Sequence, residues 1–221
     1  MEPTRHPRLK VCCIQSLAEA RLAISHGASA LGLVSAMPSG PGVIAEEAIA
    51  AIAAAVPPPV ARFLLTSLED PAAIAAQQRR LGTDTVQICD RLAPGAHAEL
   101  RRALPGVRLV QVIHVGGEES LEEARAVAPH VDALLLDSGN QSLTVKELGG
   151  TGRRHDWSLS RRIREAVAVP LFLAGGLRAE NVRQAIETVG PFGLDVCTGV
   201  RVDGALDEAR LAAFVAASSG R

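Results

Sequence analysis

The chain has 221 residues, of which 48% are hydrophobic and only 2% aromatic, and its formal net charge is −1. This length suits one α/β domain, and the aliphatic composition is typical of parallel strands buried on both faces. A charge this close to zero offers no basic surface to nucleic acid or to an anionic membrane, so we expect neither as a partner. No apolar run reaches the roughly 20 residues that a transmembrane helix needs.

Short apolar segments alternate with amphipathic segments along the chain. The apolar segments predict buried strands and the amphipathic ones predict helices with one solvated face. The predicted strands are residues 9–14, 30–34, 61–66, 85–88, 109–114, 133–137, 171–174 and 193–197. The predicted helices are residues 17–26, 45–56, 71–81, 96–104, 121–127, 159–167, 179–189 and 207–217, and Ser16, Asp70, Ser120 and Ser158 precede four of them as candidate N-caps.

These strand–helix units follow one another without a linker or a low-complexity segment. Such a series predicts an α/β fold of the (β/α)₈ TIM-barrel type, in which residues 1–221 form a single domain. An open, doubly wound sheet is the alternative. Its first strand–helix turn would need a glycine-rich fingerprint, and residues 12–16 (Cys-Cys-Ile-Gln-Ser) do not provide one.

The predicted strands end in polar or titratable residues. In a barrel enzyme the carboxyl ends of the strands surround the active site, so these side chains are candidates for chemistry. They are Cys12, Cys13, Cys89, Asp90, His114, Asp137 and Cys197. Thiolates and imidazole together could hold a zinc ion, but a buried cysteine often serves as a plain small hydrophobic residue.

Two glycine turns follow the seventh and eighth predicted strands. They contain Gly175 and Gly176 in the first turn and Thr198 and Gly199 in the second. Loops at these two places often bind phosphate in TIM barrels, because glycine lets backbone N–H groups approach the anion. Ordinary strand–helix turns are the alternative. A third glycine-rich stretch, residues 149–157, closes an unusually long connection between the sixth strand and its helix, as functional loops often do.

Five segments along the chain resemble the motifs of one enzyme family. They are Lys10-Val11-Cys12, Leu134-Leu135-Leu136-Asp137-Ser138, Gly149-Gly150-Thr151-Gly152 with Asp156-Trp157, Leu173-Ala174-Gly175-Gly176-Leu177 with Glu180-Asn181-Val182, and Gly193-Leu194-Asp195-Val196 with Gly199-Val200. In this order they resemble the motifs of phosphoribosylanthranilate isomerase, a (β/α)₈ enzyme of tryptophan biosynthesis. The resemblance covers nearly the whole chain, and its most specific motifs lie in the carboxy-terminal third.

The resemblance implies an Amadori rearrangement of an N-linked aminoaldose phosphate to a 1-amino-ketose phosphate, without a cofactor or a metal. It implies that Cys12 is the general base and Asp137 the general acid, each needing surroundings that favour its active form. The residues implied in substrate and phosphate binding are Gly175, Gly176, Thr198, Gly199, Gly150 and Cys89. A small phosphorylated sugar is the expected partner of a cytoplasmic monomer or homodimer, since the amino terminus lacks a secretory signal.

The chain also departs from the family pattern at the end of the site that holds the anthranilate. Cys13 replaces the glycine after the base, and the turn at residues 39–42 lacks the arginine of the family's Ser-Pro-Arg. The family's Gln-Leu-His-Gly ends here in Cys89 and Asp90, and its Ser-Ser-Gly-Val-Glu is residues 197–201, Cys-Thr-Gly-Val-Arg. Either another cation, such as Arg62 or Arg201, contacts the carboxylate, or the substrate differs.

Other functions stay open at this point. They are a barrel enzyme for a different phosphosugar, a metal-dependent enzyme using Cys12, Cys13, Cys89, His114 and Cys197, and a barrel that binds without catalysis. Strand alternation makes one further prediction. If Cys12 and Cys197 face the mouth, then Lys10 and Asp195 point into the barrel one layer below, where we expect an ion pair because neither charge is stable there alone.

Overall fold

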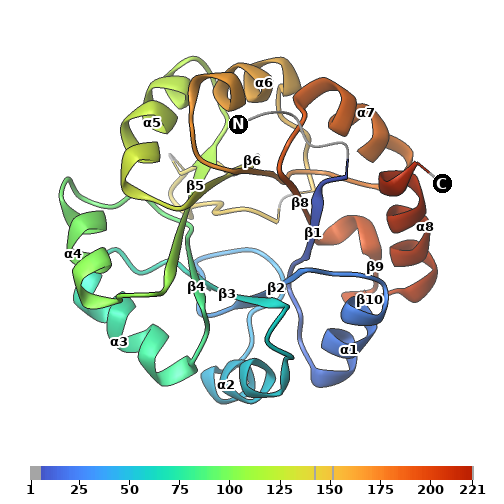
Figure 1. The fold of residues 1–221 in the computed structure, drawn as a ribbon, viewed down its shortest axis with the longest axis horizontal. Coiled ribbons are helices and arrows are strands. Elements are labelled where there is room, and N and C mark those ends of the chain that lie inside the picture. Colours follow the sequence, from blue (N-terminus) through green and yellow to red (C-terminus); the bar gives the residue numbers. More distant parts are fainter. Residues whose placement is uncertain (1–5, 142, 151, 221) are drawn as a thin grey trace.

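The computed structural model describes residues 6–141, 143–150 and 152–220. Eight parallel strands pair in the order β1 to β8 and close on themselves, and the helices form a ring outside them (Figure 1). This confirms the (β/α)₈ barrel and excludes the open sheet, because β1 pairs with both β2 and β8. Within these residues no helix is long and apolar enough to cross a membrane.

The strands lie close to their predicted positions. The barrel strands are β1 (Arg8–Val11), β2 (Ala30–Val34), β3 (Ala61–Thr66), β4 (Thr85–Ile88), β5 (Arg108–His114), β6 (Ala133–Asp137), β7 (Leu171–Leu173) and β8 (Gly193–Val196). A small antiparallel hairpin, β9 (Arg201–Val202) and β10 (Ala205–Leu206), follows β8. The sequence did not predict this hairpin, because two-residue strands are too short to show an alternating pattern.

The helices also follow the predicted order. They are α1 (Leu17–Ser25), α2 (Glu46–Ala55), α3 (Pro71–Leu81), α4 (Ala96–Ala103), α5 (Glu119–Val127), α6 (Trp157–Ala166), α7 (Ala179–Val189) and α8 (Glu208–Ser219), with short 3₁₀ turns η1 (Ala128–His130) and η2 (Thr198–Val200).

Two of the four predicted N-caps are confirmed and two are wrong. Ser16 accepts a hydrogen bond from the backbone of Glu19 at 3.2 Å, and Asp70 caps α3 in the same way. Ser120 and Ser158 lie inside the first turns of α5 and α6 instead. The true cap of α6 is Asp156, whose carboxylate accepts from the Ser158 amide at 2.8 Å.

The seam between β1 and β8 closes the barrel and contains the predicted ion pair. Lys10 is opposite Asp195 in the strand register, and its ammonium lies 2.8 Å from the carboxylate. Lys10 is completely buried. Burial alone would lower the pKa of Lys10, but the attraction of Asp195 outweighs it and the pKa is raised. The prediction from strand alternation is therefore confirmed, and both charges lie directly below the mouth of the barrel.

Candidate active site

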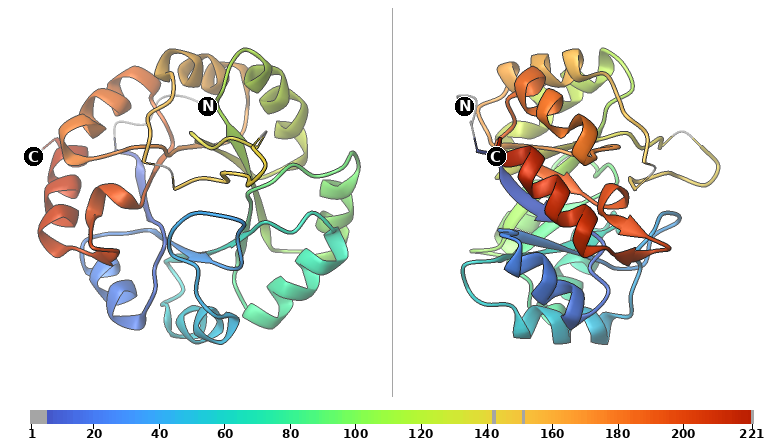
Figure 2. Two further views of the ribbon diagram at one scale, coloured as in Figure 1. Left: turned by 180° about the vertical axis from the view of Figure 1, so that it is seen from behind. Right: turned by 90° about the vertical axis from the view of Figure 1, so that its right-hand side faces the viewer.

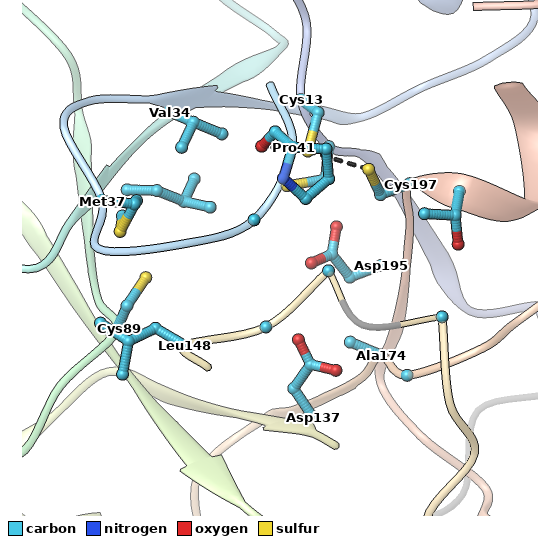
Figure 3. Close-up of a pocket in the computed structure, with 18 of the residues that line it drawn as sticks. Cys13, Val34, Met37, Pro41, Cys89, Asp137, Leu148, Ala174, Asp195 and Cys197 are labelled. Atoms are coloured by element: carbon cyan, nitrogen blue, oxygen red, sulfur yellow. Dashed lines mark hydrogen bonds between the residues drawn. The ribbon is translucent and has the colours of Figure 1, made fainter. Parts of the chain in front are cut away.

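A pocket opens at the mouth of the barrel, where the strands end (Figure 3). Its lining includes all of the residues implied in catalysis or in substrate and phosphate binding except Gly199, namely Cys12, Cys89, Asp137, Gly150, Gly175, Gly176 and Thr198, whereas the strand-end candidates Asp90 and His114 are not part of it. Residues far apart in sequence meet here because parallel strands present their carboxyl ends at one edge. The roles of these residues remain predictions, but the fold brings them to one pocket.

Cys12 and Cys13 both line this pocket, although neighbouring residues of a strand normally point to opposite sides. The backbone of Cys13 explains this, because its φ of 61° lies in the left-handed region and turns the side chain back to the mouth. That region favours glycine, the residue that the family has at this position. A Cβ on Gly42 would lie 2.8 Å from the Cys13 sulfur, so the turn after β2 must have a glycine there to leave room for this thiol.

The surroundings of Cys12 favour its thiolate. A hydrogen bond with the Cys13 thiol is the main reason that the pKa of Cys12 is lowered, and the Lys10 charge contributes in the same direction against the effect of burial. A thiolate is the form of cysteine that can accept a proton. At Cys89 burial is the largest effect and raises the pKa, so that residue stays a neutral thiol in the wall of the pocket.

Asp137 ends β6 and lies across the pocket from Cys13 (Figure 3). One carboxylate oxygen accepts a hydrogen bond from the Ser138 amide at 2.7 Å. A Cβ on Gly149 would lie 2.5 Å from the other oxygen, so only glycine lets the long connection pass this close to the acid. The strands β7 and β8 separate β6 from β1. A thiolate and a carboxyl group therefore face the same space from different sides, as an acid and a base must.

The glycine turn after β7 presents free backbone N–H groups to the pocket region. The amides of Gly175 and Gly176 donate to no other residue in the described parts of the chain, and both residues have positive φ. The side chain of Asn181 in α7 donates to the Gly176 carbonyl at 2.9 Å and fixes the turn. Unpaired amides just before a helix N-terminus are suited to an anion.

Gly199, which is predicted to bind phosphate, lies outside the lining of this pocket and beside the start of α7. A Cβ at this position would collide with the Leu177 carbonyl oxygen, so the glycine is required where the turns after β7 and β8 pack together. The pocket is lined by its neighbour Thr198 instead. A glycine needed for backbone packing and one needed for ligand approach have the same signature in the sequence.

The connection between β6 and α6 reaches over the mouth and meets the loop after β2, as the left view of Figure 2 shows. Lys146 in this connection binds the carboxylates of Asp90 at 2.5 Å and Glu69 at 3.0 Å. Its carbonyl accepts a hydrogen bond from Ser39 at 2.7 Å. These contacts hold the connection over the pocket and place Leu148 and Gly150 in its lining.

Neither Arg62 nor Arg201, the two arginines considered as contacts of the substrate carboxylate, lines the pocket. Arg62 comes near the start of β3, where it pairs with Asp84 at 2.8 Å. Arg201 is buried against Glu19 at 2.8 Å and donates to the Cys13 carbonyl. No lysine or arginine is among the described residues that line the pocket, and one side of it is apolar, formed by Val34, Met37, Leu65 and Leu148.

The side chains considered as zinc ligands do not form a shared site. In the described part of the chain, no three histidine, cysteine or acidic side chains are grouped so that they could hold a metal ion. His114 does not line the pocket, and its Nε2 atom lies 2.9 Å from the Cys89 carbonyl oxygen. The metal-dependent alternative therefore has no support from the geometry.

His155 is a residue near the site that the sequence analysis did not single out. Its two ring nitrogens are shielded from solvent and have no hydrogen-bond partner among the described residues. A Cβ on Gly175 would lie 2.9 Å from its Nδ1 and 3.3 Å from the Asp137 carboxylate, so the ring and the acid flank the same glycine. The signal that could have found it is a histidine at the position where the family motif has phenylalanine.

The closed barrel with its ligand pocket at the carboxyl ends of the strands defines the class of (β/α)₈-barrel enzymes. Within this class, residues 9–217 match the family model described as N-(5'-phosphoribosyl)anthranilate (PRA) isomerase. The chain belongs to this family.

Known relatives agree with that assignment over nearly the full length. The N-(5'-phosphoribosyl)anthranilate isomerase of Methanocella arvoryzae is 32% identical over 204 residues, 92% of this chain and 93% of the relative. That of Halobacterium salinarum is 35% identical over 213 residues, 95% of this chain and 94% of the relative.

Solved structures agree as well. The phosphoribosyl anthranilate isomerase from Thermotoga maritima superposes with a TM-score of 0.83 at 28% identity, covering 97% of this chain and 100% of that one. A structure of such an isomerase in complex with reduced 1-(o-carboxyphenylamino)-1-deoxyribulose 5-phosphate has a TM-score of 0.81 at 27% identity, with the same coverage. Another structure is described as monomers generated from the dimeric Thermotoga maritima enzyme.

Proposed function

We propose that this protein is a phosphoribosylanthranilate isomerase that acts in tryptophan biosynthesis. Family membership over residues 9–217 supports the reaction, and one solved relative binds reduced 1-(o-carboxyphenylamino)-1-deoxyribulose 5-phosphate. The observation that carries the proposal is the pocket in which Cys12 and Asp137 line the same space, beside a glycine turn with free amides. These are the groups that the rearrangement of a phosphorylated aminoaldose requires.

We assign the acid step to Asp137 and the base step to Cys12. The Asp137 carboxyl group protonates the furanose oxygen, the bond from C1 to that oxygen breaks, and the nitrogen lone pair forms the C1=N bond of a Schiff base. The Cys12 thiolate then takes the proton from C2, and the electrons left behind form a C1=C2 enolamine. The enolamine tautomerises to the 1-amino-ketose, in which C1 gains a proton and the C2 hydroxyl loses one. The lowered pKa of Cys12 supports its part in this sequence.

The binding roles follow the same geometry. The amides of Gly175 and Gly176, with Thr198 and Gly199 from the second turn, hold the phosphate at the start of α7. Gly150 and Cys89 contact the sugar from two other sides of the pocket. The reaction uses proton transfers only and needs no cofactor. We also place the enzyme in the cytoplasm, where thiols such as its four free cysteines are kept reduced.

The test is a fluorescence assay for the loss of phosphoribosylanthranilate, with the wild type beside Cys12→Ala and Asp137→Asn. Removing either proton-transfer group should lower kcat by about 10²–10⁴-fold while both variants stay folded. A wild type without turnover would contradict the function, and a variant with normal turnover would contradict the role of that residue. Complementation of a tryptophan auxotroph distinguishes an enzyme from a barrel that only binds.

A further inference from the structure

Two free thiols are in contact at the mouth of the barrel. The sulfur atoms of Cys13 and Cys197 are 2.8 Å apart, as the dashed line in Figure 3 marks, and neither cysteine is in a disulfide. A disulfide bond is about 2.05 Å long, so only a small movement separates this contact from a covalent link. Where the family motifs have glycine and serine, this chain has cysteine at both positions.

The contact follows from the seam between β1 and β8. Val11 is opposite Val196 in the register, and the Cys12 amide continues the ladder by donating to the Val196 carbonyl at 2.8 Å. Cys197 and Cys13 therefore come just after two hydrogen-bonded strands. Such strands lie about 4.8 Å apart, within the range of Cα separations that disulfides span. The left-handed backbone of Cys13 completes the approach by turning its side chain toward the pocket.

A small oxidant can reach this pair through the pocket. Both cysteines line it, and Cys197 is only half-buried while Cys13 is buried. The Pro41 carbonyl lies 3.5 Å from the Cys13 sulfur and holds the thiol on the pocket side of the loop after β2. The Cys13–Cys197 pair is therefore both accessible and aligned.

We propose that Cys13 and Cys197 are an oxidation site at which a hydroperoxide forms a reversible disulfide that slows the isomerase. The more exposed Cys197 sulfur, as thiolate, attacks one peroxide oxygen, the O–O bond breaks, and a sulfenic acid and hydroxide result. The Cys13 sulfur attacks the Cys197 sulfur, the S–O bond breaks, and water leaves. In sum two thiols are oxidised by two electrons, and hydrogen peroxide is reduced to two molecules of water.

The effect on activity rests on the proposed function, with Cys12 as the base. In the reduced protein the Cys13 thiol is the hydrogen-bond partner that mainly lowers the pKa of Cys12. A disulfide removes the Cys13 thiol hydrogen and fixes both sulfur atoms in the lining of the pocket that also contains Cys12. The pKa of Cys12 then rises and less thiolate is present near neutral pH, so proton removal from C2 slows.

The link itself is tested without any activity measurement. The reduced, full-length protein is treated with hydrogen peroxide and its disulfides are mapped by peptide mass spectrometry. The same is done with Cys12→Ser, which removes the ambiguity of two neighbouring cysteines in one peptide. We expect a Cys13–Cys197 link in both proteins and none in Cys197→Ser. A link that uses Cys12 or Cys89, or separate sulfinic acids without any link, would overturn the proposal.

The consequence is tested by kcat/KM before and after the same treatment, each protein being compared with its own untreated sample. The wild type should lose about tenfold near neutral pH, because less of the Cys12 thiolate is present, and dithiothreitol should restore the activity. Cys197→Ser should lose much less. An equal loss in Cys197→Ser, or a mapped link without loss in the wild type, contradicts the regulatory effect. A protein without isomerase activity fails the assay before treatment, so this failure of the proposed function is recognised separately.

Discussion

The thiol of Cys12 lies between two groups that favour its anion, the neighbouring Cys13 thiol and the Lys10 ammonium. Cys13 occupies a left-handed backbone conformation that costs a non-glycine residue about 1–2 kcal/mol. A glycine there would relieve that strain but would remove the hydrogen bond. At the scale of single residues, Cys13 thus combines an unfavourable backbone conformation with a thiol next to the candidate base Cys12.

The first prediction separates these two effects with Cys13→Gly and Cys13→Ser. Activity needs the thiolate, so kcat/KM rises as the pH rises through the pKa of Cys12. Without its partner in Cys13→Gly that pKa increases, so activity is lost on the low-pH side and kept at high pH, while stability should increase. Cys13→Ser keeps a donor and should stay close to the wild type. The measurement is kcat/KM against pH with a urea unfolding curve for each protein, and an unshifted ascending limb in Cys13→Gly would contradict it.

At the scale of elements, the β1–β8 seam joins the first and last strands of the barrel and carries the buried pair of Lys10 and Asp195. The ammonium also lies 5.3 Å from the centre of the Phe63 ring, which adds a cation–π contact inside the barrel. A buried ion pair does not by itself stabilise a fold relative to apolar residues, because both charges lose their hydration. Removing only one of the two charges is nevertheless expected to destabilise the fold, because the other charge stays buried without a partner.

The second prediction concerns Lys10→Met, which leaves Asp195 buried and charged at the seam. The free energy of unfolding should fall by about 3–5 kcal/mol, measured by urea denaturation. The double variant Lys10→Met with Asp195→Leu is the control, since it removes both charges and should recover much of the loss. A single variant that melts within about a degree or two of the wild type would show that the pair is not held as described.

At the scale of the whole molecule, the pocket combines the candidate acid Asp137 and base Cys12 with an apolar wall. The loops after β2 and β6 meet over it, where a Cβ on Gly150 would lie 2.6 Å from Pro41. Val34, Met37 and Leu65 belong to the apolar lining of the pocket, and the lining in the described residues contains no lysine or arginine. An anthranilate carboxylate that faced this wall would find no ion-pair partner among the described residues that line the pocket.

The third prediction is that the enzyme discriminates poorly between anthranilate and an uncharged aryl amine. A charge-assisted contact to a carboxylate is worth about 2–5 kcal/mol when it is buried, and its absence should keep kcat/KM for phosphoribosylanthranilate below about 10⁴ M⁻¹s⁻¹. The phosphoribosyl adduct of aniline should be used within about tenfold of that value. Arg62→Met is the matched control and should change neither rate constant. A strong preference for the anthranilate substrate would mean that another group binds its carboxylate.

The sequence by itself determined the parts of this protein that follow from strand alternation and from the order of the chain. Apolar segments of about five residues between amphipathic helices can pack only in a layered α/β fold, and closure of the barrel makes the last strand a neighbour of the first. Because the first and last strands are neighbours, the ion pair between Lys10 and Asp195 could be predicted from the sequence. The family motifs then assigned Cys12 and Asp137 to the mouth, where both are found.

The tertiary structure decided what depends on loops and on residues that leave the strand conformation. Alternation assigns Cys13 to the outer face, and only its positive φ brings it beside Cys12 and Cys197. The sequence left open whether Arg201 contacts a ligand. In the structure it pairs with Glu19 of α1 instead. A periodic pattern fixes where regular backbone directs a side chain. It carries no information about a turn in the left-handed region or about a long side chain whose partner lies elsewhere in the chain.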